Sequence, residues 1–419
     1  MKKVLITLSV FIVCLGISKA AYTLIPMDEA QTNQLKAYGI AYLALEKNIP
    51  VDWLLNYRGG SFSLQSTPEI EKECVIRGVK FETIADAQMA GILDEISKPE
   101  VNMDAVRLEK APKIAVYSPP SKLPWDDAVT LVLTYAEIPY KVIYDKEILQ
   151  DELSLYDWLH LHHEDFTGQY GKFYASFHHA AWYIQQQKDA EALAKEMGYS
   201  KVSQEKLAVA KKIKEYVVGG GFMFAMCSAT DSYDIALAAE GTDICAPMYD
   251  GDPMDPDCQE KLDFSKTFAF ENFDLVANPL IYEYSNIDVP AVRPMPENMD
   301  YFSLFEFSAK WDQVPAMLTQ DNTRLIKGFM GQTTAFKKEL IKKNVLIMGE
   351  NKAADEAKYI HGELGKGTWT FYGGHDPEDY RHLVGDPPTD LDLHPNSPGY
   401  RLILNNVLFP AAKKKERKT

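Results

Sequence analysis

The sequence predicts an α/β protein with a doubly wound parallel sheet, an N-terminal α/β module and a long insertion. Strand-like and helix-like segments alternate along the chain, which is typical of layered α/β units. The apolar runs at 113–117 and 222–226 are continuous, as expected for parallel strands that are buried on both faces. The chain has 419 residues, of which 46% are hydrophobic, so it can build a large core.

Residues 21–110 are predicted to form the N-terminal module, in which strands and helices alternate. The predicted strands are 21–27, 51–57 and 79–84, and the predicted helices are 30–48, 67–78 and 85–97. In the second helix Thr67 is the predicted N-cap, Pro68 suits the first helical position, and Gly78 closes the helix. We interpret the RGGS segment at 58–61 as a turn that ends the second strand.

Residues 111–412 are predicted to form the main domain. Its predicted strands are 113–119, 140–145, 156–163 and 222–226, with one more inside 365–380. Its predicted helices are 126–138, 177–216 with an interruption at 198–201, and a closing helix at 396–410 that Ser397 caps. The segment at about 243–310 is rich in Asp, Pro and Tyr, and we interpret it as an insertion with its own short strands that covers the edge of the sheet.

The first 20 residues have the pattern of a secretory signal peptide. Lys2 and Lys3 precede an apolar run at 4–17, and small residues lead up to Ala21. We expect cleavage after Ala20 and export to the periplasm or the medium. No later segment is long and apolar enough to span a membrane.

The charge balance bears on the partners of the protein. Its net charge of −16 argues against nucleic acid and anionic membranes as main partners, so a small molecule is the expected ligand. The basic tail at 413–419 is expected to be a solvated terminus.

Four cysteines remain after cleavage of the signal peptide, namely Cys74, Cys227, Cys245 and Cys258. An even number in an exported protein is compatible with two disulfides, and the sequence does not choose among the three full pairings. A bridge between Cys245 and Cys258 would close the acidic turn that they flank. A bridged Cys227 would be unable to act as a nucleophile.

Cys227 follows a Gly-rich entry and an apolar strand, and small and polar residues after it open a helix. This order is typical of a nucleophile elbow, and the small residues Ala225 and Ala229 flank the cysteine at two positions on either side. A thiol at a helix N-terminus has a lowered pKa. The alternative is an inert thiol at the end of a core strand, because cysteine is often buried.

A cysteine nucleophile needs a base, and His375 after the predicted strand within 365–380 is the candidate. Glu378 or Asp376 could orient its imidazole. The oxyanion would be held by backbone N–H groups after Cys227, at Ser228, and near Gly220. The alternative is a solvated surface loop.

The segment around 160–165 offers a second set of reactive groups. His162, His163 and Glu164 are candidates for gripping a ligand, and in a strand His160 and His162 would share one face while His163 takes the other. Together with His178 and His179 these imidazoles and carboxylates have the chemistry of metal ligands, but no standard zinc spacing is present. We therefore expect hydrogen bonding in a polar pocket, with no metal and no cofactor.

The segments at 113–117, 140–145, 156–166, 217–231 and 365–378, with the closing helix, resemble the class I glutamine amidotransferase-like superfamily, and its trehalose-utilisation (ThuA-like) branch in particular. The resemblance covers roughly residues 113–410 and implies a flavodoxin-like sheet. It also implies that Cys227 is the nucleophile, that His375 is the triad histidine, and that Glu378 stands near the place of the triad acid.

The whole chain also resembles exported bacterial proteins that carry the label asparagine synthetase B. The residues argue against that activity, because Lys2 stands where an N-terminal cysteine nucleophile would be needed and no pyrophosphate loop is present. We therefore expect a cysteine-dependent hydrolase of a small amide or carbohydrate-derived substrate. The alternatives are a non-catalytic ligand-binding protein and a metal-dependent hydrolase that uses the histidine cluster.

Overall fold

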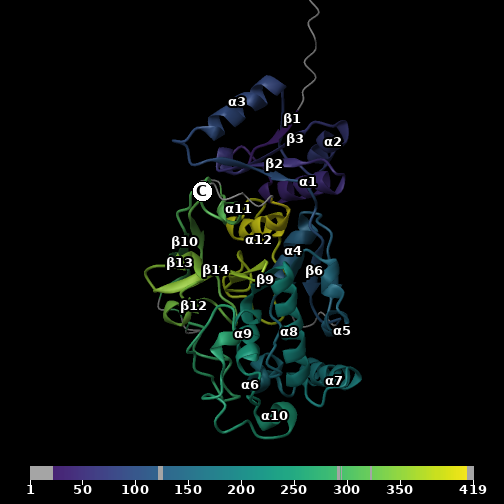
Figure 1. Ribbon diagram of the computed structural model, residues 1–419, viewed down its shortest axis with the longest axis vertical. Helices are drawn as coiled ribbons and strands as arrows, with labels where there is room; N and C mark the ends of the chain where they lie inside the picture. Colours follow the sequence, from purple (N-terminus) through teal and green to yellow (C-terminus); the bar gives the residue numbers. More distant parts are fainter. Residues whose placement is uncertain (1–21, 121–125, 290–292, 294, 321–322, 413–419) are drawn as a thin grey trace, which may run out of the picture.

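The computed structural model describes residues 22–120, 126–289, 293, 295–320 and 323–412 (Figure 1). The predicted signal peptide and the basic tail at 413–419 lie outside the described residues. In the described part of the chain, no helix combines the length and the apolar character that crossing a membrane requires.

The N-terminal module forms a five-stranded sheet with the order β4-β1-β3-β2-β5, in which all neighbours are antiparallel. Its elements are β1 (Tyr22–Ile25), α1 (Gln34–Glu46), β2 (Val51–Leu55), β3 (Ser61–Gln65), α2 (Pro68–Ile76), β4 (Glu82–Ile84), α3 (Asp86–Ser97) and β5 (Asp104–Leu108). The first four strands and first two helices therefore make a split β-α-β arrangement.

Strand β3 corrects the prediction for this module, which had no strand directly after the RGGS turn. The turn at 57–60 connects β2 and β3 as a hairpin, with positive φ angles at Arg58, Gly59 and Gly60. Polar Ser61 and Ser63 alternate with Phe62 and Leu64 in β3, which is a strand pattern that the prediction overlooked, and all four side chains are buried.

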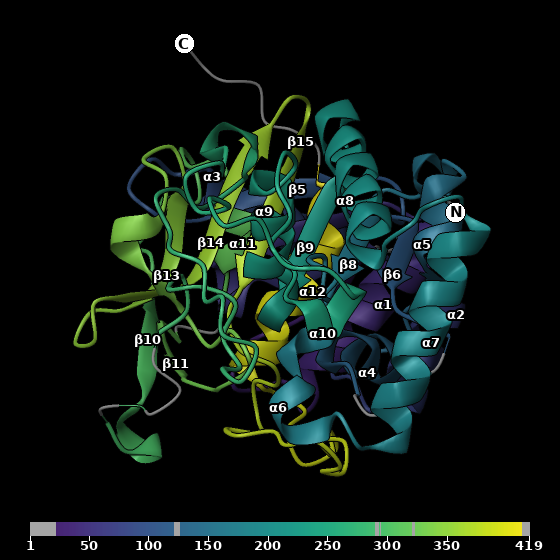
Figure 2. The same ribbon diagram turned by 90° about the horizontal axis from the view of Figure 1, so that it is seen from below.

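The main domain contains five parallel strands, as its α/β character predicted. They are β6 (Ile114–Tyr117), β7 (Lys141–Ile143), β8 (Trp158–Leu161), β9 (Phe222–Met226) and β15 (Gly367–Tyr372). Their spatial order is β7-β6-β8-β9-β15, which is 2-1-3-4-5 in order of appearance along the chain. Figure 2 shows β15, β9, β8 and β6 side by side.

The sheet continues beyond β15 with antiparallel strands, so it is mixed and not parallel throughout. These strands are β14 (Glu356–Leu364), β13 (Leu346–Asn351), β10 (Tyr301–Leu304) and β11 (Leu325–Lys327), and β12 (Phe336–Lys337) pairs with β14. Within 243–310, β10 is the one named strand that the structure describes, and it belongs to the main sheet. Both faces of β14 are buried along most of its length, and the polar side chains of Glu356, Lys358 and His361 interrupt its apolar pattern.

Helices cover both faces of the parallel strands. The helices described in the main domain are α4 (Ala128–Tyr135), α5 (Asp145–Leu149), α6 (Tyr174–Phe177), α7 (Ala181–Glu196), α8 (Val202–Gly219), α9 (Asp231–Ala238), α10 (Pro247–Asp250), α11 (Pro315–Leu318) and α12 (Pro398–Leu408). Of these, α6, α7 and α10 pack with one another in a separate apolar cluster. On β9, Phe224 and Met226 join the core under α4 and α12, whereas Met223 and Ala225 join the core under α8 and α9.

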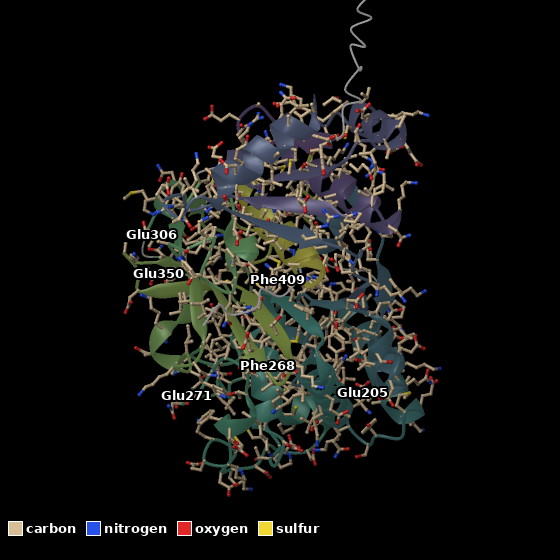
Figure 3. The ribbon with its side chains drawn as sticks, turned by 45° about the horizontal axis from the view of Figure 1, so that its top comes forward. Glu205, Phe268, Glu271, Glu306, Glu350 and Phe409 are labelled. Atoms are coloured by element: carbon tan, nitrogen blue, oxygen red, sulfur yellow. The ribbon has the colours of Figure 1, made fainter. Side chains whose placement is uncertain are left out.

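The N-terminal module shares one of these cores. Residues of α1, β2 and β3 belong to the same buried cluster as residues of α4, α12 and the sheet. Arg401 of α12 is fully buried and donates hydrogen bonds from Nε to the Tyr38 hydroxyl at 2.9 Å and from Nη2 to the carbonyl oxygen of Gly59. In Figure 3, Phe409 lies between this module and the sheet, and Phe268 lies toward the opposite face.

Several predicted helix ends are confirmed. Thr67 accepts a hydrogen bond from the N–H of Ile70, and Ser397 accepts one from the N–H of Tyr400. The long helical stretch divides into α7 and α8, with a break at 197–201.

Candidate functional site

Cys227 lies at the sharp turn between β9 and the helical segment that leads into α9. Its φ angle is +51°, in the left-handed region that residues with a side chain seldom adopt. Only 3% of its surface is exposed. The backbone therefore has the strained geometry of a nucleophile elbow, while the side chain is buried.

Backbone N–H groups of three residues act on the Cys227 thiol. Burial raises the pKa of the thiol, while N–H groups of Thr333, Gln332 and Ser228 act in the opposite direction. Ser228 is itself buried, and its hydroxyl has no hydrogen-bond partner among the described residues. All four cysteines at 74, 227, 245 and 258 are free, so the bridge considered between Cys245 and Cys258 is not formed.

His375 follows β15 at the same edge of the sheet. The parallel register of β15 and β9 pairs Tyr372 with Met226, so both strands end together. His375 Nδ1 lies 2.9 Å from His162 Nε2, which makes a hydrogen bond between two imidazoles. Burial, and then the neighbouring imidazoles of His162 and His163, hold the pKa of His375 well below its usual value.

Asp127 is the acid that faces this pair, and it was not among the predicted site residues. Its carboxylate caps α4 and lies 3.4 Å from His162 Nδ1 and 3.2 Å from His160 Nε2. Burial acts to raise the pKa of Asp127, but the charges of His160 and His162 hold it well below its usual value. Asp127, His162 and His375 thus form a chain of ionisable groups.

His163 joins the same cluster. His162, His163 and His375 each offer a ring nitrogen, and these nitrogens all lie within 4.8 Å of one another. The alternation of faces expected for a strand does not apply to His162 and His163, because β8 ends at Leu161. Burial, and then His162, lower the pKa of His163 to about 3.

A second acid–imidazole group lies behind His375 and was also missed. The ring of His382 stacks on that of His375 at a centroid distance of 4.6 Å. His382 Nε2 lies 2.7 Å from a carboxylate oxygen of Asp126, and its Nδ1 lies 2.8 Å from one of Asp379. The sequence signal was a second histidine seven positions after His375 and a pair of aspartates after the first strand of the main domain.

Two predicted residues lie elsewhere. Glu378 lies 3.2 Å from His394, and the carboxylate that lies 3.4 Å from His162 is that of Asp127. Gly220 follows α8 at the amino end of β9 and lies seven positions before Cys227, which is roughly 20 Å of extended chain. The N–H of Gly220 therefore cannot hold an oxyanion at Cys227, and that prediction was wrong.

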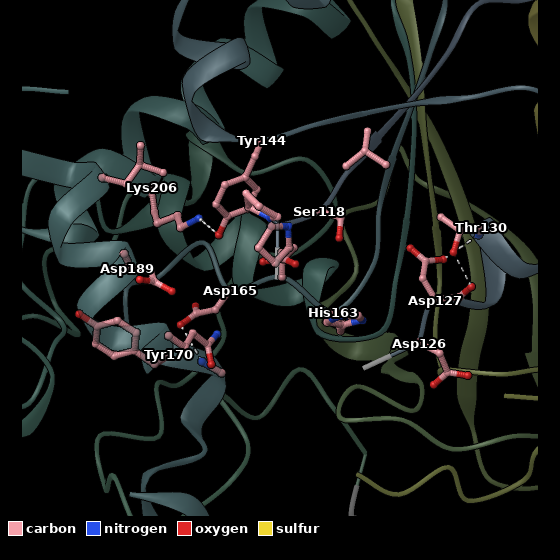
Figure 4. Close-up of a pocket in the computed structure, with 18 of the residues that line it drawn as sticks. Ser118, Asp126, Asp127, Thr130, Tyr144, His163, Asp165, Tyr170, Asp189 and Lys206 are labelled. Atoms are coloured by element: carbon pink, nitrogen blue, oxygen red, sulfur yellow. Dashed lines mark hydrogen bonds between the residues drawn. The ribbon is translucent and has the colours of Figure 1, made fainter. Parts of the chain in front are cut away.

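A cavity of about 700 Å³ opens at the carboxyl ends of β6 and β8. Figure 4 shows its polar lining, which includes Asp126, Asp127, His163, Asp165 and Lys206. Glu164 also lines the cavity. Two of the predicted ligand-binding residues, His163 and Glu164, therefore line the cavity. Among the described residues, neither Cys227 nor His375 contributes to its lining.

The wall of the cavity contains a buried ion pair. Lys206 Nζ lies 2.7 Å from Asp145 Oδ2 and donates hydrogen bonds to the hydroxyls of Tyr117 and Tyr144, each at 2.9 Å. Burial raises the pKa of nearby Glu164 to about 8, although the charge of Lys206 opposes this shift. Glu164 is therefore largely protonated at neutral pH and can donate a proton.

The fold and the site together define an α/β protein with a ligand-sized cavity at the carboxyl edge of its parallel strands. No family model and no curated protein matches the chain. Solved structures give low similarities, which indicate no function for this chain.

The descriptions of two of these structures give no function. The cytoplasmic protein STM3548 from Salmonella typhimurium has a TM-score of 0.35 at 9% identity, over 72% of this chain and 100% of that chain. The cytoplasmic protein STM1381 from Salmonella typhimurium LT2 has a TM-score of 0.36 at 10% identity, over 72% of this chain and 99% of that chain. The beta-galactosidase from Bacillus circulans sp. alkalophilus has a TM-score of 0.25 at 12% identity, over 74% of this chain and 32% of that chain.

Proposed function

We propose that this protein binds a small polar molecule in the 700 Å³ cavity and hydrolyses it with imidazole and carboxyl groups. One observation carries the proposal: His163, Glu164, Asp126 and Asp127 line the same cavity at the carboxyl edge of the sheet. In open α/β sheets, ligands bind in the crevice beyond the carboxyl ends of the strands.

The two groups that would meet the substrate have complementary protonation states. Glu164, with its pKa raised to about 8, would act as a general acid, and His163, with its pKa lowered to about 3, would remain neutral and accept hydrogen bonds. Asp127 would hold His162 in one orientation, and His162 would in turn position His375.

The lining favours a neutral or cationic substrate over an anion. Carboxylates at 126, 127, 165 and 189 face the cavity, and the ammonium group of Lys206 is already paired with Asp145. Carboxylates accept hydrogen bonds from hydroxyl and amino groups, and Tyr140 and Tyr170 add aromatic surface. A carbohydrate-derived molecule or a small amide with free hydroxyl or amino groups fits this chemistry.

We further propose that the main domain is flavodoxin-like and related to the class I glutamine amidotransferase-like superfamily. The strand order 2-1-3-4-5 supports the first part, and the cysteine at the turn after β9 supports the second. Export remains a proposal that the sequence pattern of residues 1–20 supports.

A cysteine-dependent hydrolase is the second candidate function. The φ angle of +51° at Cys227 and the backbone N–H groups around its sulfur favour it. For this function the side chain would have to become accessible to substrate, because in this structure it is buried.

Substitutions on helix α7 test the use of the cavity. Ala190 lines it, whereas Ala192 on the same helix is exposed outside the lining. We expect Ala190→Trp to fill the cavity and to abolish the thermal stabilisation that hydroxylated and amino compounds give to the wild-type protein. Ala192→Trp should retain that stabilisation.

Two outcomes would count against parts of this proposal. Equal stabilisation of both tryptophan variants would exclude the cavity as the binding site. Binding without turnover of any bound compound would leave a non-catalytic ligand-binding protein.

A further inference from the structure

We propose that His162, His163 and His375 together bind one divalent transition-metal ion, such as Zn²⁺, beside the cavity. The inference deepens the proposed function and rests on it in one respect, because the same cavity would deliver the substrate to the ion. The ion itself follows from the arrangement of side chains alone.

The positions of the ring nitrogens carry the proposal. The three imidazoles come from the end of β8 and the loop after β15, and their nitrogens lie within 4.8 Å of one another. Zn–N bonds are about 2.0–2.1 Å long, so nitrogens on one tetrahedral ion are roughly 3–3.5 Å apart. One pair, His162 Nε2 and His375 Nδ1, is 2.9 Å apart and shares one proton in a hydrogen bond. A cation would replace that proton and separate the two rings slightly.

A carboxylate lies behind one of the three imidazoles, as is usual at metal sites. Histidine ligands of metals usually present their second ring nitrogen to a carboxylate, a backbone carbonyl or water, which fixes the ring and raises its basicity. In His162 the second ring nitrogen is Nδ1, which lies 3.4 Å from Asp127 Oδ1, while Nε2 points to His375. Asp127 is in turn fixed by the N–H groups of Val129 and Thr130.

The donor set indicates the class of ion. Imidazole ligands suit Zn²⁺, Cu²⁺, Fe²⁺ and Ni²⁺, whereas Mg²⁺ and Ca²⁺ prefer oxygen ligands. Three protein ligands leave a position for water or substrate, as in catalytic zinc sites. His163 lines the cavity together with Asp126 and Asp127, so this position faces the space that a ligand would occupy.

A competing ligand set shares one residue with this site. Asp126, His375 and His382 also bring three ligand atoms within 4.8 Å of one another. His382, however, is already engaged by two carboxylates, at 2.7 Å and 2.8 Å. The experiment must therefore separate His163 from His382.

We would strip the full chain with a chelator, equilibrate it with Zn²⁺, and measure the bound metal after gel filtration. The Co²⁺-substituted protein would be examined by visible absorption, which reports the geometry of the ligands. We expect one ion per chain in the wild-type protein and in His179→Ala, because His179 is exposed and outside the cluster. We expect His163→Ala, His163→Gln and His375→Ala to lose stoichiometric metal, and Asp127→Asn to bind it about 10–100-fold more weakly.

Three results would overturn the assignment. These are no stoichiometric metal in the wild-type protein, unchanged loading of both His163 variants, or loss of metal in His382→Ala while the His163 variants retain it. His163 is only partly buried, so its variants should fold, and far-UV circular dichroism would check this. The proposed function is tested separately from the metal site. Thermal stabilisation by ligands is measured on the chelator-treated protein, and its loss in Ala190→Trp needs no metal.

Discussion

His162 Nε2 and His375 Nδ1 lie 2.9 Å apart although 213 positions separate the two residues in the chain. They meet because β8 and β15 both pair in parallel with β9, so the carboxyl ends of all three strands lie at one edge of the sheet. The site is therefore a product of strand order and register, and it lies next to the turn that carries Cys227. The N–H of Ala229, two residues after the cysteine, donates a hydrogen bond to the carbonyl oxygen of His162 at 2.9 Å.

The first prediction concerns Asp231, at the start of α9. Burial raises its pKa from 3.8 to about 7, although a hydrogen bond from the Thr333 hydroxyl opposes the shift. An acid with a raised folded-state pKa contributes stability that is fully present below pH 3.8 and is lost as the pH rises through about 7. We expect Asp231→Asn to match the wild-type protein at pH 4 and to be more stable at pH 8, by at most about 4 kcal/mol.

Urea unfolding at the two pH values would measure this difference. Asp94→Asn, at an exposed position on α3, is the control and should change the free energy of unfolding little at either pH. A variant Asp231→Asn that is equally destabilised at both pH values would show that the carboxylate form is needed in the folded state.

The second prediction concerns the junction between the N-terminal module and α12. Arg401→Met should lower the free energy of unfolding by on the order of 3 kcal/mol, because it leaves the buried oxygens of Gly59 and Tyr38 without their donor. Arg107→Met, at a half-exposed ion pair with Asp52, should cost less than about 1 kcal/mol. Chemical denaturation would compare the two, and equal effects would mean that the Arg401 contacts do not hold the module in place.

The third prediction concerns the ion pair in the cavity wall. Lys206→Met should destabilise the protein by about 3–5 kcal/mol, because the buried carboxylate of Asp145 then has no cation. The double variant with Asp145→Asn should lose clearly less than the sum of the single changes. Lys212→Met, on the exposed side of the same helix, should change stability by less than about 1 kcal/mol. Additive losses in denaturant unfolding would contradict this account.

The fourth prediction concerns the reactivity of Cys227. Burial raises the pKa of its thiol, which lowers the thiolate fraction at neutral pH, and only 3% of the residue is exposed to a reagent. We expect alkylation of Cys227 at pH 7 to be at least about tenfold slower in the folded protein than in denaturant, as mapped by peptide mass spectrometry. Rapid labelling of the folded protein at pH 7 would instead favour the cysteine-dependent hydrolase, and His375→Ala would then show whether this imidazole activates the thiol.

Helix ends were predictable because their signals are local. Thr67 and Ser397 bond to N–H groups only three positions away, so each cap can be identified within a window of four residues. The concentration of histidines after the strand at 158–161 was predictable for a similar reason, since the apolar run ends where the polar residues begin. The antiparallel strands β13 and β14 were not, because buried polar side chains interrupt their apolar pattern. The partners of these side chains lie elsewhere in the chain, as Arg293 does for Glu356 and the carbonyl oxygen of Thr334 for Lys358.

The sequence by itself determined the α/β class, the helix caps and the presence of reactive side chains after β8, β9 and β15. Only the tertiary structure decided that Asp127 rather than Glu378 faces His162, that Gly220 lies at the far end of β9 from Cys227, and that the thiol is buried. The physical reason is the sequence range over which each signal extends. Helix caps and apolar runs are set by a few neighbouring residues, whereas the distances among imidazoles and carboxylates depend on strand order and on the helices that cover the sheet.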